Sequence, residues 1–178
     1  MEHKENYKYN NDMEKERILV FSDVHGDSLA MGRIKAAAAK LNINTLLSLG
    51  DLCPDPLDPI WRGVIGVRGN MDRFYEYGDL PFPPRELIIN KFGRRIIAVH
   101  GNDYPSIVPE KGDIVLYGHT HVAKAEGKNG VYYCNPGSPS RPRSSLGPTF
   151  GVLDEEGFSI LSLLDFKSIS TLTFSSSQ

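Results

Sequence analysis

The sequence predicts a single α/β domain, built as a sandwich of two β-sheets flanked by helices. With 178 residues the chain is long enough for one domain with a proper core and too short for two. Its first half alternates apolar, strand-like runs with a helical segment, and its second half consists of short strand-like segments separated by Gly, Asn and Pro. An α/β opening followed by a β-rich half is typical of one mixed sandwich.

The first half opens with RILVFS at residues 17–22, an apolar run of strand formers that ends at the polar cluster DVHGDS. SLAMGRIKAAAAKLN follows; it is rich in helix formers with apolar residues at helical spacing, and Asp27 or Ser28 is expected to cap it. TLLSLGD and GVIGVRGN are two further strands with glycines at their ends. We therefore expect a largely parallel, buried sheet, with no full crossover helix in the proline-broken stretch 52–63.

The second half contains six strand-like segments, namely RELIIN, RRIIAVHG, DIVLYGHTH, AKAEGKNGVYYCNPGS, TFGVLDEEGFSILSLL and STLTF. The sequences KFGR, GKNG and DEEG within or between them are typical of hairpin turns. No repeat, heptad pattern or low-complexity linker interrupts this order. We therefore expect one domain over residues 17–178.

Residues 1–16 are polar and charged, without an apolar core, so they predict a solvated, mobile lead-in rather than a secretory signal. The longest apolar runs are far too short to span a membrane. Cys53 and Cys134 are the two cysteines and form no C-x-x-C pair, which argues against a disulfide framework or zinc finger. This composition fits a reducing compartment, and we expect a cytoplasmic protein.

The charge balance gives no indication of broad electrostatic binding and leaves individual basic patches open. Twenty basic and twenty-two acidic residues give a net charge of −2, so nothing in the composition favours a membrane surface or nucleic acid as partner. A metal-dependent nuclease lacks the basic and aromatic strip that single-stranded nucleic acid requires.

Polar side chains follow five of the predicted strands. Four of the five histidines lie there together with two carboxylates and one amide, and the set is Asp23, His25, Asp51, Asn70, His100, His119 and His121. Because the carboxyl ends of strands in an α/β sheet form one rim, we expect these side chains to converge in one cleft. In extended chain, residues i and i+2 point to the same side, so each D-x-H or H-x-H pair addresses one point.

This donor set predicts a metal centre. Carboxylates, imidazoles and an amide, without thiolate, suit Mn, Fe, Zn, Ni or Co better than Mg or Ca. Seven ligands are more than one tetrahedral ion can bind, so two metals that share a carboxylate are the natural interpretation. Taken singly, a lone His is more often structural and a lone Asp more often a cap or turn residue. Their joint occurrence at strand ends favours the metal site.

The ordered motifs of the chain resemble the five signature blocks of the calcineurin-like metallophosphoesterases. The blocks are D-x-H at 23–25, G-D at 50–51, G-N-x-D at 69–72, H-G at 100–101 and G-H-x-H at 118–121. The short chain and the NPGS sequence at 135–138 resemble those of the small phosphodiesterase branch. This branch also contains the retromer-type scaffold subunit. The resemblance covers roughly residues 17–165 and implies a β-sandwich flanked by helices.

The resemblance also implies how the ligands divide. One metal would take Asp23, His25, Asp51 and His121, and the other would take Asp51, Asn70, His100 and His119, with Asp51 bridging. The residues alone indicate the same seven ligands but do not divide them. We expect two divalent ions, Mn²⁺ first, with Fe, Zn, Ni or Co as alternatives. The implied activity is hydrolysis of small phosphodiesters by attack of a metal-bridging hydroxide, with Asp51, Asn70 and His100 as catalytic residues.

Met71 departs from the pattern of many relatives, which carry a histidine between the Asn and the acidic residue of this block. That histidine helps to protonate the leaving group or to hold the phosphate, although the small phosphodiesterase branch commonly has another residue there, often cysteine. Losing a general acid typically costs about 10²–10⁴ in rate for poor leaving groups. Our hypothesis is therefore a preference for phosphodiesters with good leaving groups, or for a substrate that brings its own acid.

Several other residues near the motifs have weaker signals. Arg68 and Arg73 flank the Asn70 block, but exposed arginines are usually only solvated. In NPGSPSRPR, Ser138 or Arg141 could approach the substrate, although a plain proline-rich turn is the simpler interpretation. Cys53 is expected to be a buried structural cysteine.

The principal alternative function is a non-catalytic, protein-binding scaffold that retains the phosphoesterase fold. A vestigial site should have lost histidines or carboxylates, and none is missing here, which favours the enzyme. The sequence leaves open the natural substrate, the metals bound in the cell and whether the chain forms a homo-oligomer.

Overall fold

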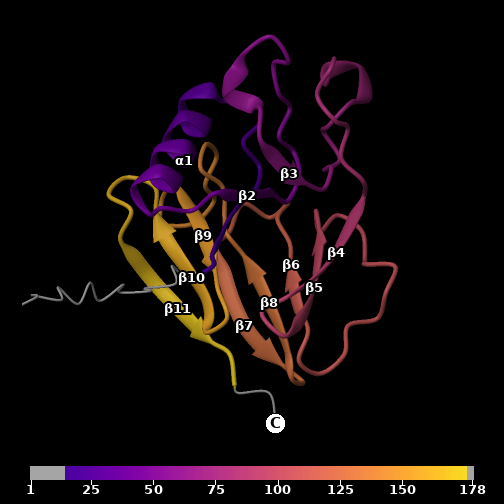
Figure 1. Ribbon diagram of the computed structural model, residues 1–178, viewed down its shortest axis with the longest axis vertical. Helices are drawn as coiled ribbons and strands as arrows, with labels where there is room; N and C mark the ends of the chain where they lie inside the picture. Colours follow the sequence, from indigo (N-terminus) through magenta and orange to yellow (C-terminus); the bar gives the residue numbers. More distant parts are fainter. Residues whose placement is uncertain (1–14, 176–178) are drawn as a thin grey trace, which may run out of the picture.

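The first β-sheet combines the beginning and the end of the chain. The computed structural model describes residues 15–175. Six strands form this sheet in the order β11-β10-β9-β1-β2-β3 (Figure 1). Their bounds are β1 Ile18–Phe21, β2 Thr45–Ser48, β3 Val64–Gly66, β9 Thr149–Leu153, β10 Gly157–Ser162 and β11 Ser168–Thr173. β1, β2 and β3 are parallel, as predicted, and β9, β10 and β11 extend the sheet as antiparallel strands.

The second sheet contains the middle of the chain, in the order β4-β5-β6-β8-β7. Its strands are β4 Glu86–Lys91, β5 Arg94–Val99, β6 Ile114–Leu116, β7 Lys124–Lys128 and β8 Val131–Asn135. Two hairpins, β4–β5 and β7–β8, turn at Phe92-Gly93 and Asn129-Gly130, and all four turn residues have positive φ, as type I′ turns require. These turns confirm the predictions made from KFGR and GKNG. β5, β6 and β8 run parallel to one another.

One α-helix, α1 Ser28–Lys40, is the only α-helix among residues 15–175. Of the two predicted caps Asp27 is the one used, because its side chain accepts a hydrogen bond of 2.9 Å from the Ala30 N–H. The other helical segments are single 3₁₀ turns, η1 Pro59–Trp61 and η2 Phe74–Glu76. The stretch between β2 and β3 therefore crosses over without an α-helix, as its prolines predict. Within the described residues, no helix has the length and apolar character needed to cross a membrane.

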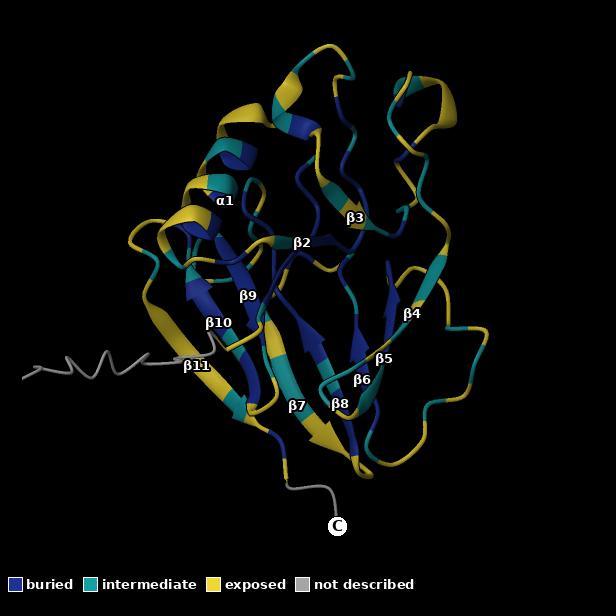
Figure 2. Ribbon diagram, in the orientation of Figure 1, coloured by how far each residue is buried: buried dark blue, intermediate teal, exposed yellow. Residues whose placement is uncertain are grey.

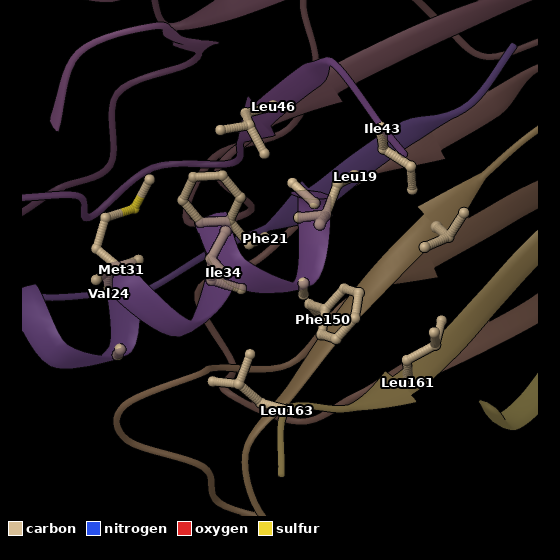
Figure 3. Close-up of a cluster of buried hydrophobic side chains, with 14 of the residues drawn as sticks. Leu19, Phe21, Val24, Met31, Ile34, Ile43, Leu46, Phe150, Leu161 and Leu163 are labelled. Atoms are coloured by element: carbon tan, nitrogen blue, oxygen red, sulfur yellow. The ribbon is translucent and has the colours of Figure 1, made fainter. Parts of the chain in front are cut away.

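Two apolar layers hold the fold together, one on each face of β1. Leu19 and Phe21 point toward α1, where they pack with Met31, Ile34 and other buried side chains (Figure 3). Ile18 and the other alternate side chains of β1 point to the opposite layer, which contains residues of both sheets. The strands that form these layers are the buried ones in Figure 2, whereas β7 and β11 are largely exposed. This alternation explains why the strand before the first motif is apolar at every position.

Close packing at Gly151 makes a prediction about stability. A methyl group at Gly151 would lie 2.2 Å from Cζ of Phe158, in the next strand. Gly151→Ala should therefore lower the free energy of unfolding by about 1–3 kcal/mol through overpacking. Urea unfolding measures this, and in the double variant with Phe158→Leu the two losses should not add, with a coupling of about 0.5–3 kcal/mol.

Gly32 of α1 is the matched control, because a methyl group there would meet no atom within 4 Å. Gly32→Ala should raise stability by about 0.5–1 kcal/mol through helix propensity. Equal effects of the two glycine substitutions would contradict the packing argument.

The predicted lead-in falls mostly outside the described residues. Residues 1–14 are not described, and the expectation of a mobile segment there stays a prediction. Its last two residues, Lys15 and Glu16, form ion pairs with Glu156 and Lys91. Exposed pairs of this kind contribute little to stability, about 0–1 kcal/mol.

Candidate metal centre

The motif loops meet because five parallel-running strands end at one rim, three in the first sheet and two in the second. Backbone hydrogen bonds tie neighbouring loops together. The N–H of Asp23 donates to the Gly50 carbonyl at 2.9 Å, and the N–H of His25 donates to the Asp51 carbonyl at 2.9 Å. On the second sheet, the Gly118 N–H donates to the His100 carbonyl at 2.8 Å. The predicted convergence of strand ends is thus a direct result of parallel pairing.

Five of the seven predicted ligands form two overlapping groups. In each of the two groups, Asp23-His25-His121 and Asp23-Asp51-His100, the ligand atoms lie within 4.8 Å of one another. Asp23 Oδ1 lies 3.3 Å from Nε2 of His121 and 3.9 Å from Nε2 of His25. Asp51 Oδ2 lies 3.4 Å from Nε2 of His100 and 3.9 Å from Nε2 of His25. One cluster of imidazoles and carboxylates results.

The chemistry of this cluster fits a metal ion. Among the described residues, Asp23 Oδ1 and His100 Nε2 are buried and have no hydrogen-bond partner. The 3.4 Å contact of His100 Nε2 with Asp51 Oδ2 is an ion-pair distance but is too poorly aligned for a hydrogen bond. Buried polar atoms without partners are rare because they cost free energy. Both atoms are ordinary metal ligands, so a bound ion would satisfy them.

Backbone contacts at Nδ1 hold the Nε2 atoms of two histidines toward the cluster. The Nδ1 atom of His100 lies 2.8 Å from the Leu49 carbonyl, and that of His121 lies 2.7 Å from the Arg141 carbonyl. When each Nδ1 carries its proton and donates to the carbonyl, Nε2 is left with the lone pair that binds a metal.

The two carboxylates are held in the same manner, each by one oxygen. Oδ2 of Asp23 accepts from the His119 N–H at 2.9 Å, and Oδ1 of Asp51 accepts from the Met71 N–H at 2.8 Å. Each carboxylate therefore keeps its other oxygen for the centre. Met71, whose side chain cannot exchange a proton, contributes through its backbone.

Asn70 and His119 belong to neither group, but both line the hollow beside it. This hollow has a volume of about 470 Å³ and is also lined by His25, Asp51, Met71, His121, Arg141 and Arg143. The rings of His119 and His100 approach edge to face, with centroids 5.1 Å apart. A second hollow of about 550 Å³ is lined by Asn70 and His100 together with Arg68 and the 99–106 segment. Asn70 thus borders both hollows.

The backbone at the centre differs from the extended chain that we assumed for the D-x-H and H-x-H pairs. Among residues 15–175, ten non-glycine residues have positive φ, and five of these are predicted ligands, namely Asp23, His25, Asp51, His119 and His121. The i, i+2 rule for strands was therefore the wrong reason for the pairing. Tight left-handed bends bring Asp23 and His25 to one point, whereas His119 and His121 lie beside different partners, His100 and His25. Such strain is typical of functional sites.

Burial and charge set the protonation of the cluster. Burial lowers the pKa of His25, although Asp51 opposes the shift. For His100, burial acts to lower the pKa, but the neighbouring Asp51 carboxylate outweighs it and the pKa is raised. For Asp51, burial acts to raise the pKa, and the contacts of its oxygens with His100 and the Met71 N–H outweigh it, so the pKa is lowered. His25 is thus biased toward the neutral form that binds metal.

Asp72 braces the centre from outside. Its buried carboxylate accepts hydrogen bonds from the Cys53 N–H at 2.8 Å, the Gly69 N–H at 2.8 Å and the Tyr77 hydroxyl at 2.9 Å. These contacts join the Asp51 loop to the Asn70 loop. Cys53 is half-buried rather than buried as we predicted, and burial raises the pKa of its thiol to about 12. The acidic end of the G-N-x-D block is therefore structural.

The end of β8 and the segment after it fasten two motif loops, which the sequence did not reveal. Nδ2 of the buried Asn135 donates to the Gly118 carbonyl at 2.9 Å. The Ser138 hydroxyl donates to the Asp23 carbonyl at 2.8 Å, and the Ser140 hydroxyl donates to the Val24 carbonyl at 2.9 Å. Ser138, a weak candidate for substrate contact, instead positions Asp23. The prolines of this segment predicted only a turn. The serine hydroxyls bind carbonyl groups more than 100 residues away in sequence, and such contacts have no local signal.

The two arginines beside the Asn70 block differ in position. The guanidinium group of Arg68 lies 5.2 Å from the centroid of the Phe82 ring and borders the second hollow. Arg73 lines neither hollow.

Comparison with known proteins gives consistent matches. Residues 17–157 match the calcineurin-like phosphoesterase superfamily domain. Phosphodiesterase YfcE of Escherichia coli K12 is 28% identical over 173 residues, covering 84% of this chain and 93% of that protein. The probable metallophosphoesterase YsnB of Bacillus subtilis is 26% identical over 149 residues, covering 78% of this chain and 84% of the relative.

Solved structures share the fold. YfcE, described as a phosphoesterase from E. coli, superimposes with a TM-score of 0.78 at 25% identity, covering 90% of this chain and all of that one. A single mutant of Vps29 from Entamoeba histolytica superimposes with a TM-score of 0.62 at 23% identity, covering 89% of this chain and 99% of its own. At this identity the second match concerns the fold alone.

Proposed function

The chain belongs to the calcineurin-like phosphoesterase superfamily, and from this premise we propose that it is a phosphodiesterase with a dinuclear metal centre. The observation that carries the proposal is the buried, unpartnered pair of ligand atoms, Asp23 Oδ1 and His100 Nε2, inside a cluster of imidazoles and carboxylates. The relative from E. coli that is named a phosphodiesterase supports the choice of diesters.

In the proposal, the ligands divide as the family pattern implies. Asp23, His25, Asp51 and His121 would hold one ion, and Asp51, Asn70, His100 and His119 the other. Divalent ions bound there would activate water and neutralise the charge on the phosphoryl group, and Mn²⁺ is our first choice, with Fe, Zn, Ni or Co as alternatives. The free thiols of Cys53 and Cys134 support a reducing compartment, and we propose the cytoplasm.

The side chains around the centre would bind and orient the substrate. Asn70 borders both hollows, so its carboxamide could face a metal with its oxygen and donate an N–H to a phosphate oxygen. His100 and Asp51 would keep their geometry through the backbone contacts of Leu49 and Met71. The hollows, about 470 and 550 Å³ in volume, suit a small phosphodiester.

The test combines metal content with hydrolysis. We expect the purified protein to bind about two divalent ions per chain and, with Mn²⁺, to hydrolyse bis-p-nitrophenyl phosphate faster than p-nitrophenyl phosphate. Metal analysis and absorbance of released nitrophenolate measure the two quantities. A protein that binds no metal and hydrolyses neither ester would contradict the proposal.

Met71 gives a prediction about leaving groups. Its side chain is 45% exposed and lines the hollow, where it cannot donate a proton. Met71→His should therefore raise turnover of diesters with alkyl leaving groups by up to about 10²-fold, and change turnover of nitrophenyl esters little. The ratio of kcat for the two ester classes measures the effect, with Met71→Leu as the control that supplies no imidazole. If Met71→His left this ratio unchanged, our explanation of the position would be wrong.

A non-catalytic scaffold is the alternative function. Its support is the shared fold with Vps29, whose name identifies it as a vacuolar protein sorting protein. Against it stand the five clustered ligands, with Asn70 and His119 lining the hollow beside them, since a scaffold does not require unpartnered ligand atoms to be kept in its interior. The hydrolysis measurement above separates the two functions, because metal binding alone does not: Vps29 from Entamoeba histolytica is also described in complex with zinc.

A further inference from the structure

Arg141 and Arg143 form a pair of unpartnered cations on the rim of the metal hollow. Both are exposed and line the hollow together with His25, His119 and His121. No ion pair or side-chain hydrogen bond of either arginine exists among residues 15–175. Most other arginines are engaged: Arg62 pairs with Asp79, Arg85 with Asp103 and Arg95 with Asp113, and Arg17, Arg68 and Arg94 donate to carbonyl groups.

The backbone under this pair is fixed to the centre itself. The Arg141 carbonyl lies 2.7 Å from Nδ1 of His121, and the Arg141 N–H donates to the Ser138 hydroxyl at 2.8 Å. The Arg143 N–H donates to the His121 carbonyl at 3.0 Å. Because His121 is held on both sides by this segment, the backbone of the two arginines has a fixed position relative to the cluster. The exposed guanidinium groups are thus attached at the rim of the hollow, and their planar fork matches the geometry of a phosphate group.

Charge balance indicates what this pair binds. Asp51 is the only acidic residue that lines the hollow among the described residues, against two arginines. Ions held by Asp23 and Asp51 would at least neutralise these carboxylates, so a diester with a single negative charge would leave the arginines unbalanced. Guanidinium groups bind phosphate oxygens in bidentate pairs, and such charge-assisted bonds are among the strongest in proteins.

Resting on the proposed phosphodiesterase function, we propose that Arg141 and Arg143 bind a second phosphate group of the substrate. The substrate class is then a small phosphodiester that carries a further phosphomonoester, not a simple diester. The two residues determine specificity; the seven metal ligands and the reaction itself are unchanged by this assignment.

Anion binding to the metal-free protein tests the pair independently of catalysis. Titration with inorganic phosphate should shift the Nε–Hε NMR signals of Arg141 and Arg143 with saturation, and leave that of Arg33 unshifted. Arg33 is the matched control, because it is exposed on α1 and lines neither hollow. Arg141→Gln and Arg143→Gln together should weaken phosphate binding by at least about 10-fold. No shift, or equal shifts of all three signals, would overturn the proposal.

Hydrolysis by the metal-loaded enzyme tests the substrate class. The p-nitrophenyl ester of thymidine 5′-phosphate should have a KM about 10-fold lower when the nucleoside also carries a 3′-phosphate. The double glutamine variant should lose this ratio, whereas Arg33→Gln should keep it. A ratio of one in the native enzyme would overturn the proposal, as would stronger competition by a long oligothymidylate, which would reassign the pair to nucleic acid. If neither ester is hydrolysed, the proposed function fails, and the phosphate titration alone decides on the arginines.

Discussion

Asp51→Asn should lower both metal binding and phosphodiesterase turnover by at least about 100-fold, because substitutions even outside the ligand set typically cost 10–100-fold. Asp51 has one oxygen, Oδ2, within 4 Å of the Nε2 atoms of both His25 and His100. Its other oxygen accepts the Met71 N–H at 2.8 Å. Asparagine at position 51 removes the negative charge that two bound cations would share. Because its side chain is nearly isosteric with that of aspartate, the fold should be unchanged.

The measurement pairs metal titration calorimetry with steady-state hydrolysis. Asp58→Asn is the matched control, because Asp58 caps η1 by accepting the Ile60 N–H at 2.9 Å and lines neither hollow. Asparagine caps as well as aspartate, so this variant should keep wild-type metal affinity and rate. If the Asp51→Asn protein bound metal and hydrolysed the ester like the Asp58→Asn control, Asp51 would not be a ligand and the proposed ligand set would be wrong.

Asp72→Ala should lower the free energy of unfolding by about 3–5 kcal/mol, since each buried donor left without an acceptor costs about 1–3 kcal/mol. The donors are the N–H groups of Cys53 and Gly69 and the hydroxyl of Tyr77. For a chain of this size the midpoint temperature should fall by roughly 10 °C, at about 2–4 °C per kcal/mol. Calorimetric unfolding of the metal-free proteins measures the loss without any contribution from bound ions.

Tyr77→Phe separates the parts of this network. It removes one donor and leaves both backbone N–H groups bound to Asp72, so it should cost only about 1 kcal/mol. If Asp72→Ala were no more destabilising than Tyr77→Phe, the link between the Asp51 and Asn70 loops would not depend on the carboxylate.

Much of the fold could be predicted from the sequence because the local patterns agree with the strands and turns that the structure forms. The apolar run at 17–22 and the two glycine-closed strands predicted the parallel core of the first sheet, and Asn-Gly at 129–130 predicted a hairpin turn. The predicted sandwich of two sheets is confirmed, and its helical part consists of α1 and two 3₁₀ turns among the described residues. The parallel pairing of β5, β6 and β8 could not be predicted, because it depends on which strands meet across long connections.

The candidate site was readable for a different reason. Residues that can bind metals come directly after the strands, and the ends of these strands converge. Their positions in the sequence were therefore enough to predict that His100 and His121 lie near Asp23. The part of the site that could not be predicted consists of contacts that have no signal in the sequence. Left-handed φ values at Asp23 and His25 replace the extended chain that we assumed, and the hydroxyl of Ser138 reaches a carbonyl far away in the chain. Such contacts depend on the folded arrangement.

The fastening of Asp23 by the segment after β8 has a consequence for synthesis on the ribosome. The Asp23 carbonyl is bound by Ser138 and Ser140, 115 and 117 residues later. While the chain grows, the D-x-H loop therefore emerges long before the residues that secure it. Contacts this distant form late in folding. A nascent chain stalled before residue 135 should thus expose ligands without a finished centre, and metal acquisition should follow, not precede, completion of the second sheet.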